Sequence, residues 1–355
     1  MTSPSPSKSY ETRSIHISAS HHAICSLISL FLKKTEEVYT FSNSGQGPEI
    51  LMDEYIHDFG CKYRLVGRHS HSTLKKNSPL SNEKKVSDIT IVMHVRIPGW
   101  DCLKMTSLKS LRNIFGKDSI LETYISKKES ITLPDESESN LNFVSPGYHF
   151  AIKMELSRLP ADLSIESWSK KLSKIRTTVF GCQLEEGFLR ISEHLSGRGK
   201  EQDSDYIKLC RIPMQRPTKR GYGGDCIICN YPERVTVVLV VDYDDEIDRA
   251  LAKLFMRQFS QSRRSSSANS PFCDYWRGCE PPREIEELYT SKSMGDIAGF
   301  LSFTFLIDHV RSQGKREKAV NLITSFFPFI DNQIKSSKSI LHARMREKLP
   351  PSDIL

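Results

Sequence analysis

The sequence lacks an apolar run long enough to cross a bilayer. The apolar stretch Ala23–Leu32 holds ten residues, two of them serines, whereas a membrane-spanning helix needs about 20 apolar residues. The stretch also begins late for a secretory signal and has no small-residue cleavage pattern. We therefore expect a cytoplasmic protein with no membrane span.

The sequence is equally poor in catalytic and cofactor-binding motifs. The glycine-rich stretches Gly197–Lys200 and Gly221–Gly224 do not have the spacing of a phosphate-binding loop. The histidines in His21–His22 and His69–His71 have no carboxylate or cysteine at ligand spacing. No nucleophile–base motif is present, although catalytic triads are assembled in space and not in sequence. We predict a protein that is not an enzyme and that uses no cofactor.

The nine cysteines are an odd number scattered over a long chain, which is typical of reduced thiols and not of a disulfide framework. Cys226 and Cys229 have the spacing of half a zinc site, for which Cys273 and Cys279 would be the other half. The second pair is too widely spaced, and the first lies in a predicted strand, where residues three apart point to opposite faces. We favour structural cysteines, with a zinc-binding module using Cys226 and Cys229 as an alternative.

The chain has fewer acidic than basic residues, and its formal net charge of +7 favours acidic partners. A basic nucleic-acid-binding protein is therefore a second alternative. Against it, Phe300, Phe303 and Phe305 are accompanied by aliphatic residues in a predicted strand, and no RNA-recognition signature is present. We expect these aromatic residues in the core and no nucleic-acid partner.

Length and the order of periodic segments predict an α+β fold of two similar tandem units followed by a long C-terminal helix. With 355 residues, 38% of them hydrophobic, the chain can form two ordinary domains. Each half reads strand, strand, helix, strand, helix, which indicates an antiparallel-rich sheet with helices on one face. The expected divisions are a disordered leader at 1–20, domains at 21–182 and 183–310, the helix at 311–349 and a tail at 350–355.

Alternating apolar residues predict the strands, and spacings of three and four predict the helices. The clearest strands are Val86–Ile97, Tyr148–Leu156, Arg234–Tyr243 and Gly295–Ile307. Leu51–Val66 is expected to be one further strand region. A helix that begins at Ser164 is expected to end at Gly181, where the first unit gives way to the second.

The last helix has an apolar surface that is too wide for one neighbour. Its main stripe, which recurs at helical spacing, consists of Leu322, Phe326, Ile330, Ile334, Leu341 and Met345. Further apolar residues around Ile323 widen the stripe beyond the roughly 100° that one neighbour needs. We predict that this helix packs on its own sheet and also contacts another protein. Pro328 falls inside it and would cost about 3 kcal/mol unless a kink absorbs the clash.

The same helix is basic. Between Arg311 and Lys348, nine lysines and arginines stand against three acids. A charge run of this kind is usually a solvated face, but it also favours an acidic partner. The cations toward its end are Lys335, Lys338, Arg344, Arg346 and Lys348.

One loop carries a candidate modification site. Arg263 and Arg264 directly precede Ser265 and Ser266 in a polar stretch. A basic pair before serines matches a kinase site, so both serines are candidates for phosphorylation. A match this short fits a solvated loop more often.

Segments of the C-terminal third resemble, in order, subunit 2 of the actin-related protein 2/3 complex. They are ERVTVVLV (233–240), KLFMRQF (253–259), EPPREIEEL (280–288), GDIAGFLSFTF (295–305), NLITSF (321–326) and IKSSKSILHARMREK (334–348). Before them, the strand GYHFAIKMEL (147–156) also looks similar.

This resemblance implies two α/β domains and a long helix that pairs with subunit 4 of the complex. It implies a structural, actin-binding scaffold that holds the actin-related subunits and contacts the actin filament during nucleation of branched actin. The apolar stripe of the last helix would then be the partner-subunit interface. The cations from Lys335 to Lys348 would be the filament contacts.

Overall fold

The computed structural model describes most of the chain in separate stretches. They are residues 24–34, 50–58, 60–70, 88–115, 121–125, 144–155, 165–195, 208–214, 224–264, 270–289 and 297–348. Within these stretches, no helix combines the length and hydrophobicity that crossing a membrane requires.

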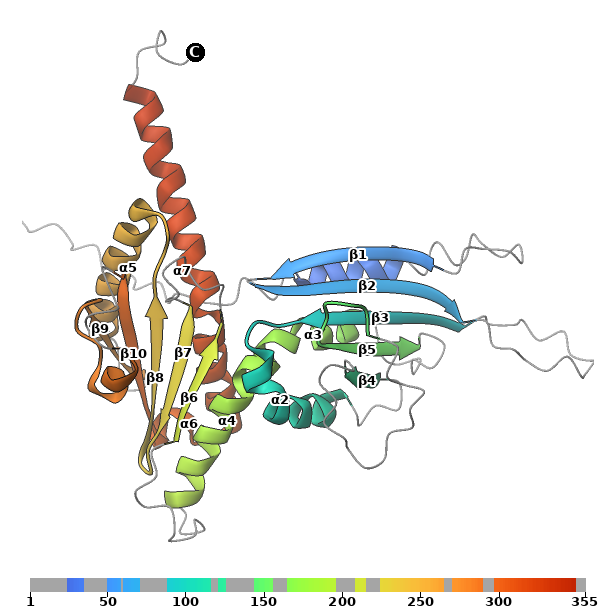
Figure 1. The fold of residues 1–355 in the computed structure, drawn as a ribbon, viewed down its shortest axis with the longest axis horizontal. Helices are drawn as coiled ribbons and strands as arrows, with labels where there is room; N and C mark the ends of the chain where they lie inside the picture. The colour runs from blue at the N-terminus through green and yellow to red at the C-terminus, as the bar shows by residue number, and fades with distance from the viewer. Residues whose placement is uncertain are drawn as a thin grey trace, which may run out of the picture.

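The first unit is a five-stranded antiparallel sheet with the strand order β1-β2-β3-β5-β4 (Figure 1). Its elements are a helix at residues 24–34, β1 (Ile50–Asp58), β2 (Cys61–Ser70), β3 (Asp88–Arg96), α2 (Trp100–Phe115), β4 (Leu121–Ile125), β5 (Phe150–Glu155), α3 (Ile165–Ser173) and α4 (Ile175–Leu195). The helices bury apolar residues against the strand face that carries Tyr63, Met93 and Phe150.

The second unit repeats this arrangement with the strand order β6-β7-β8-β10-β9. Its elements are β6 (Lys208–Pro213), β7 (Asp225–Asn230), β8 (Arg234–Val241), α5 (Glu246–Arg264), β9 (Phe272–Trp276), the 3₁₀ helix η5 (Arg283–Leu288), β10 (Gly299–Leu306), α6 (Ile307–Val310) and α7 (Gln313–Lys348). Both sheets place their strands in the same order when the strands are counted within each unit. The predicted α+β fold with a tandem repeat is therefore confirmed.

The sheets contain more strands than the sequence pattern predicted. Each unit has five strands instead of three, because β4 and β9 are short edge strands without clear alternation. The predicted strand region Leu51–Val66 is in fact the hairpin of β1 and β2. Its turn contains Gly60 at φ +86°, a conformation that glycine adopts at little cost.

Side chains on β8 and β10 divide between two cores on opposite faces of the second sheet. Val237, Leu239 and Phe303 belong to the larger core, which also contains α4, α5 and α7. Val238 and Phe300 face the other way, where Ile285 of η5 and Tyr289 cover them. Phe300, Phe303 and Phe305 are all fully buried, as expected. They are therefore not available to stack on nucleic-acid bases.

Helix α4 joins the two units, because it packs both on α2 and on α7 (Figure 1). It continues through Gly181 to Leu195, so the predicted boundary between 182 and 183 falls within a helix and not in a linker. The reason is that Gly181 is a packing residue. A Cβ atom at this position would overlap Cγ1 of Val320 in α7.

Helix α7 is continuous across Pro328. It begins beside the second sheet, and its C-terminal end extends beyond that sheet, away from the rest of the protein (Figure 1). This projecting end is the most prominent feature of the molecule outside the two units.

Candidate interaction surface

Helix α7 changes its environment at Ile334. Up to this residue its apolar side chains are buried: Ala319, Val320, Ile323, Phe326, Phe327, Ile330 and Ile334. Leu322 is half-buried and packs against the same core. The prediction that Phe326, Ile330 and Ile334 contact another protein is therefore wrong, because this chain covers them itself.

A cluster of aromatic rings from three elements explains why this half of α7 is so apolar. The ring of Phe326 lies 5.5 Å from that of Phe259 in α5 and 5.8 Å from that of Phe303 in β10. The ring of Phe329 lies 5.5 Å from that of Phe255, also in α5. These edge-to-face contacts stabilise the packing beyond the burial of area alone. The wide apolar arc therefore serves neighbours that all belong to this chain: the sheet, α4 and α5.

Beyond Ile334 the helix is largely exposed. Leu341 is 43% exposed and Met345 is 64% exposed, and the helical repeat places both on the same side as Ile334. Ile340, 55% exposed, lies on a flank of that side. Exposed apolar groups that gather in this way mark interaction sites more often than isolated ones do. The candidate surface, called the α7 tip below, is residues 335–348.

Three of the five predicted contact cations lie exposed on the α7 tip: Lys335, Arg344 and Arg346. Lys348 is the last residue of α7. At 100° per residue, Lys335 and Arg346 lie on one flank of the apolar side, and Arg344 and Lys348 lie on the other. The tip therefore combines an apolar centre with a basic rim, an arrangement common at protein interfaces.

The fifth cation, Lys338, is used within the chain. Its Nζ lies 2.8 Å from a carboxylate oxygen of Asp248 and 3.3 Å from one of Asp245, both at the start of α5. The hydrogen bond to Asp248 is the main reason that the pKa of Lys338 is raised, while the Asp248 amide and Lys338 lower the pKa of Asp245. Lys338 therefore ties the base of the tip to α5. Its assignment as a filament contact stays a prediction.

Two further polar contacts near the base of the tip were not predicted. The hydroxyl of Tyr243 donates a 2.6 Å hydrogen bond to Asp331 of α7, and burial together with this carboxylate raises the pKa of Tyr243. Arg249 pairs with the buried Asp242 at 3.2 Å. In the sequence, the acidic cluster at Asp242–Asp248 indicates negative charge at this place, but it does not identify Arg249 as the partner of Asp242.

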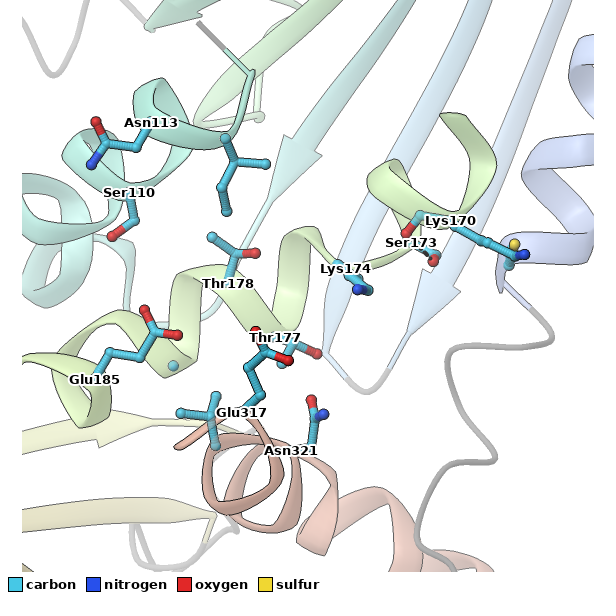
Figure 2. A pocket seen from close by; sticks show the side chains of 14 residues that line it. Ser110, Asn113, Lys170, Ser173, Lys174, Thr177, Thr178, Glu185, Glu317 and Asn321 are labelled. Carbon is cyan, nitrogen blue, oxygen red and sulfur yellow. Dashed lines mark hydrogen bonds between the residues drawn. The ribbon is translucent and has the colours of Figure 1, made fainter. Parts of the chain in front are cut away.

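A second surface feature is a groove of about 720 Å³ between the two units. Figure 2 shows side chains that line it, among them Ser110 and Asn113 from α2, Lys170 from α3, Glu185 from α4 and Glu317 from α7. Burial raises the pKa of Glu185, and Arg316 opposes that shift. The lysines Lys170 and Lys174 and the glutamates Glu185 and Glu317 give the lining of the groove charges of both signs.

The cysteine pair does not form half of a metal site. Cys226 lies in the large core, and Cys229 lies in the small core on the opposite face of the sheet. Two side chains on opposite faces of one strand cannot bind the same ion. Cys273 is buried and Cys279 is exposed. This geometry argues against the zinc-binding alternative.

Some predictions lie outside the described residues. Ser265 and Ser266, the candidate modification sites, fall between α5 and β9 in a stretch that the structure does not describe. The predicted leader at 1–20 and the tail at 350–355 also lie outside the described stretches. All three remain predictions.

Comparisons with known proteins agree with the resemblance that the sequence shows. The family model of the Arp2/3 complex 34 kD subunit p34-Arc matches residues 103–351. The chain is similar to actin-related protein 2/3 complex subunit 2 of Schizosaccharomyces pombe, at 27% identity over 206 residues that cover 57% of this chain and 64% of that protein. It is also similar to subunit 2A of Arabidopsis thaliana, at 26% identity over 204 residues that cover 57% of this chain and 58% of that protein. The aligned region thus spans about three fifths of each relative.

Proposed function

Because this chain belongs to the p34-Arc family of Arp2/3 complex subunits, we propose that it is a structural, actin-binding subunit of an Arp2/3 complex in the cytoplasmic actin cytoskeleton. Its role is to hold the actin-related subunits and to contact the mother filament while branched actin is nucleated. This role requires no catalysis by the chain.

The observation that supports this proposal is the exposure of Leu341 and Met345 on the α7 tip. An apolar side chain that projects from a folded domain gains free energy when a partner covers it. We propose that a helix of subunit 4 packs along this side of the tip. The interface is therefore smaller and lies further along α7 than the sequence predicted, because it begins after Ile334.

The cations on the flanks of the tip suit a filament contact. Actin filaments are acidic, and charges at the rim of an interface mainly set the encounter rate and its salt dependence. We propose Lys335, Arg344, Arg346 and Lys348 for this contact. Lys338 is left out, because it already pairs with Asp245 and Asp248.

Affinity purification of the full-length chain from its own cells tests the proposal. The wild type should retain the other subunits of the complex, and Leu341→Asp with Met345→Asp should lose them while keeping the fold, as judged by circular dichroism. Ile340→Asp is the matched control, because it places the same charge on the flank. Complexes that carry Arg344→Glu with Arg346→Glu should assemble but sediment less with actin filaments at low salt. Loss of subunits by Ile340→Asp alone, or normal assembly of the double Asp variant, would contradict the assigned surface.

A further inference from the structure

Pro328 leaves a gap in the hydrogen bonding of α7. In an α-helix the amide of each residue donates to the carbonyl four residues earlier, and proline has no amide hydrogen to donate. The carbonyl of Thr324 therefore lacks its donor from within the helix. Thr324 is fully buried, and leaving a buried carbonyl without a donor would be costly. Some other group has to supply the hydrogen bond.

The guanidinium of Arg176 fills this gap. Its Nη2 donates a 2.7 Å hydrogen bond to the carbonyl oxygen of Thr324. Arg176 stands at the start of α4 and is only 1% exposed, so this donor is fixed by its surroundings and shielded from water. A charged donor makes a stronger hydrogen bond than a neutral amide. The contact also joins the helix that connects the units to the helix that carries the tip.

The same guanidinium reaches the first sheet. Its Nε lies 3.9 Å from a carboxylate oxygen of Asp58, which is 4% exposed at the end of β1. Burial raises the pKa of Asp58, and the nearby guanidinium opposes the rise. A buried arginine without a carboxylate nearby would be strongly destabilising. Asp58 therefore compensates the charge that Arg176 carries into the interior.

We propose that Arg176 is a positioning residue that replaces the amide missing at Pro328 and thereby fixes α7 against the hairpin of the first unit. One guanidinium then connects β1, α4 and the point in α7 where the helical hydrogen bonding is interrupted. The direction of the tip is set from the first unit as well as from the second. This inference goes beyond the proposed function and does not rest on it.

Removing Pro328 gives a direct test, because alanine restores the amide that Arg176 replaces. All variants in this test also carry Asp58→Asn, so that removing the guanidinium of Arg176 leaves no unpaired carboxylate. Hydrogen exchange is measured on peptides that cover residues 321–334 in the full-length chain. Arg176→Met should accelerate exchange there by roughly 5-fold to 150-fold, the range expected for one unsatisfied buried acceptor. Adding Pro328→Ala should return exchange close to the rate of Asp58→Asn alone.

The matched control is the other buried arginine–aspartate pair, Arg249 and Asp242. Arg249→Met on an Asp242→Asn background removes a comparable pair that does not contact Thr324. Adding Pro328→Ala to this variant should not reverse the change in hydrogen exchange that Arg249→Met causes. If Arg176→Met on the Asp58→Asn background gives insoluble protein, soluble protein on adding Pro328→Ala supports the proposal, and continued insolubility overturns it. The proposal would also be overturned if Pro328→Ala changed the rate of hydrogen exchange equally in proteins with Arg176 and in proteins with Arg176→Met.

Discussion

Helices α4 and α7 come after the last strand of their respective units, yet their exposed surfaces differ. Apart from Leu189, the apolar residues of α4 are buried as far as Ile191, because α2 of the first unit and elements of the second unit pack around the helix. Helix α7 packs its apolar residues on neighbours only as far as Ile334, and beyond the ion pairs of Lys338 with the start of α5 its tip is exposed. The same position in a repeated unit can thus be internal or external, depending on whether a second unit packs against it. A long helix at the end of a repeat is therefore a natural attachment point for another protein.

The largest loss of stability is expected from a substitution in the first half of α7, which is buried within the chain as α4 is. Ile330 is fully buried, so Ile330→Asp would place an unpaired charge in the core and should cost about 4 kcal/mol or more of folding free energy. Urea unfolding of the full-length chain measures this loss, and insoluble protein would agree with it. Met345→Asp, at a site that is 64% exposed, is the control and should leave the midpoint unchanged. Equal effects at the two sites would remove the distinction between the buried half of α7 and the tip.

A smaller effect is expected at the contact between the two helices. Gly181→Ala would bring a methyl group into Cγ1 of Val320, and valine cannot easily rotate away because its side chain is branched at Cβ. Overpacking of this kind should cost about 1–3 kcal/mol. Val320→Ala in the same protein should recover part of the loss. The matched control is Gly314→Ala in α7, which has open space around it and should match the wild type or exceed it in thermal unfolding.

The smallest expected effect is on the pH dependence of stability, to which one histidine in each unit should contribute. Nδ1 of His149 accepts a 3.0 Å hydrogen bond from the amide of Ile97 in the first unit. Nδ1 of His309 accepts one from the amide of Leu306, also at 3.0 Å, in the second unit. Burial lowers the pKa of both histidines from 6.5. Nearby charges act on each: Arg96 and Asp101 on His149, and Asp308 and Lys315 on His309.

The lowered pKa values determine the sign of the pH dependence. As the pH falls below about 6.5, the unfolded chain takes up protons that the folded chain resists, so stability decreases until the folded pKa is passed. Unfolding midpoints at pH 7.5 and 5.5 should therefore differ less in a variant with both His149→Asn and His309→Asn. Exposed His57→Asn is the control. An unaltered pH profile in the double variant would exclude these two histidines as the cause.

Sequence patterns predicted the parts of the fold that are governed by periodicity. The strongly alternating segments around Met93, Ile152 and Leu239 are strands, and the repeat of the two units could be read from their order. Short edge strands such as β4 and β9 were missed, because one edge has no neighbour and the alternation is weak. Gly181 was interpreted as a helix end, since a glycine inside a helix looks the same in sequence whether it ends the helix or packs against another.

The predicted surface extended over the whole apolar stripe of the last helix, and this chain covers the first half of that stripe itself. Periodicity shows that Phe326 and Ile330 need cover, but it does not show that Phe259 and Phe303 of the same chain provide it. Lys338 likewise looked like the other cations, because Asp245 and Asp248 lie far away in sequence. Arg176 gave no signal at all, since the gap that it fills is created by a proline on another helix. Contacts between distant segments account for each of these differences.

The distribution of the cysteines has a practical consequence for spectroscopy. Burial raises the pKa of Cys61 and Cys229 to about 12, so these thiols stay protonated at neutral pH and react slowly, because the thiolate is the nucleophile. Cys102 in the first unit and Cys279 in the second are exposed. With the half-buried Cys25 and Cys210 replaced by serine, a thiol-reactive probe should attach once to each unit. Two of the chain's own cysteines, Cys102 and Cys279, thus serve as labelling sites for measuring the distance between the two units.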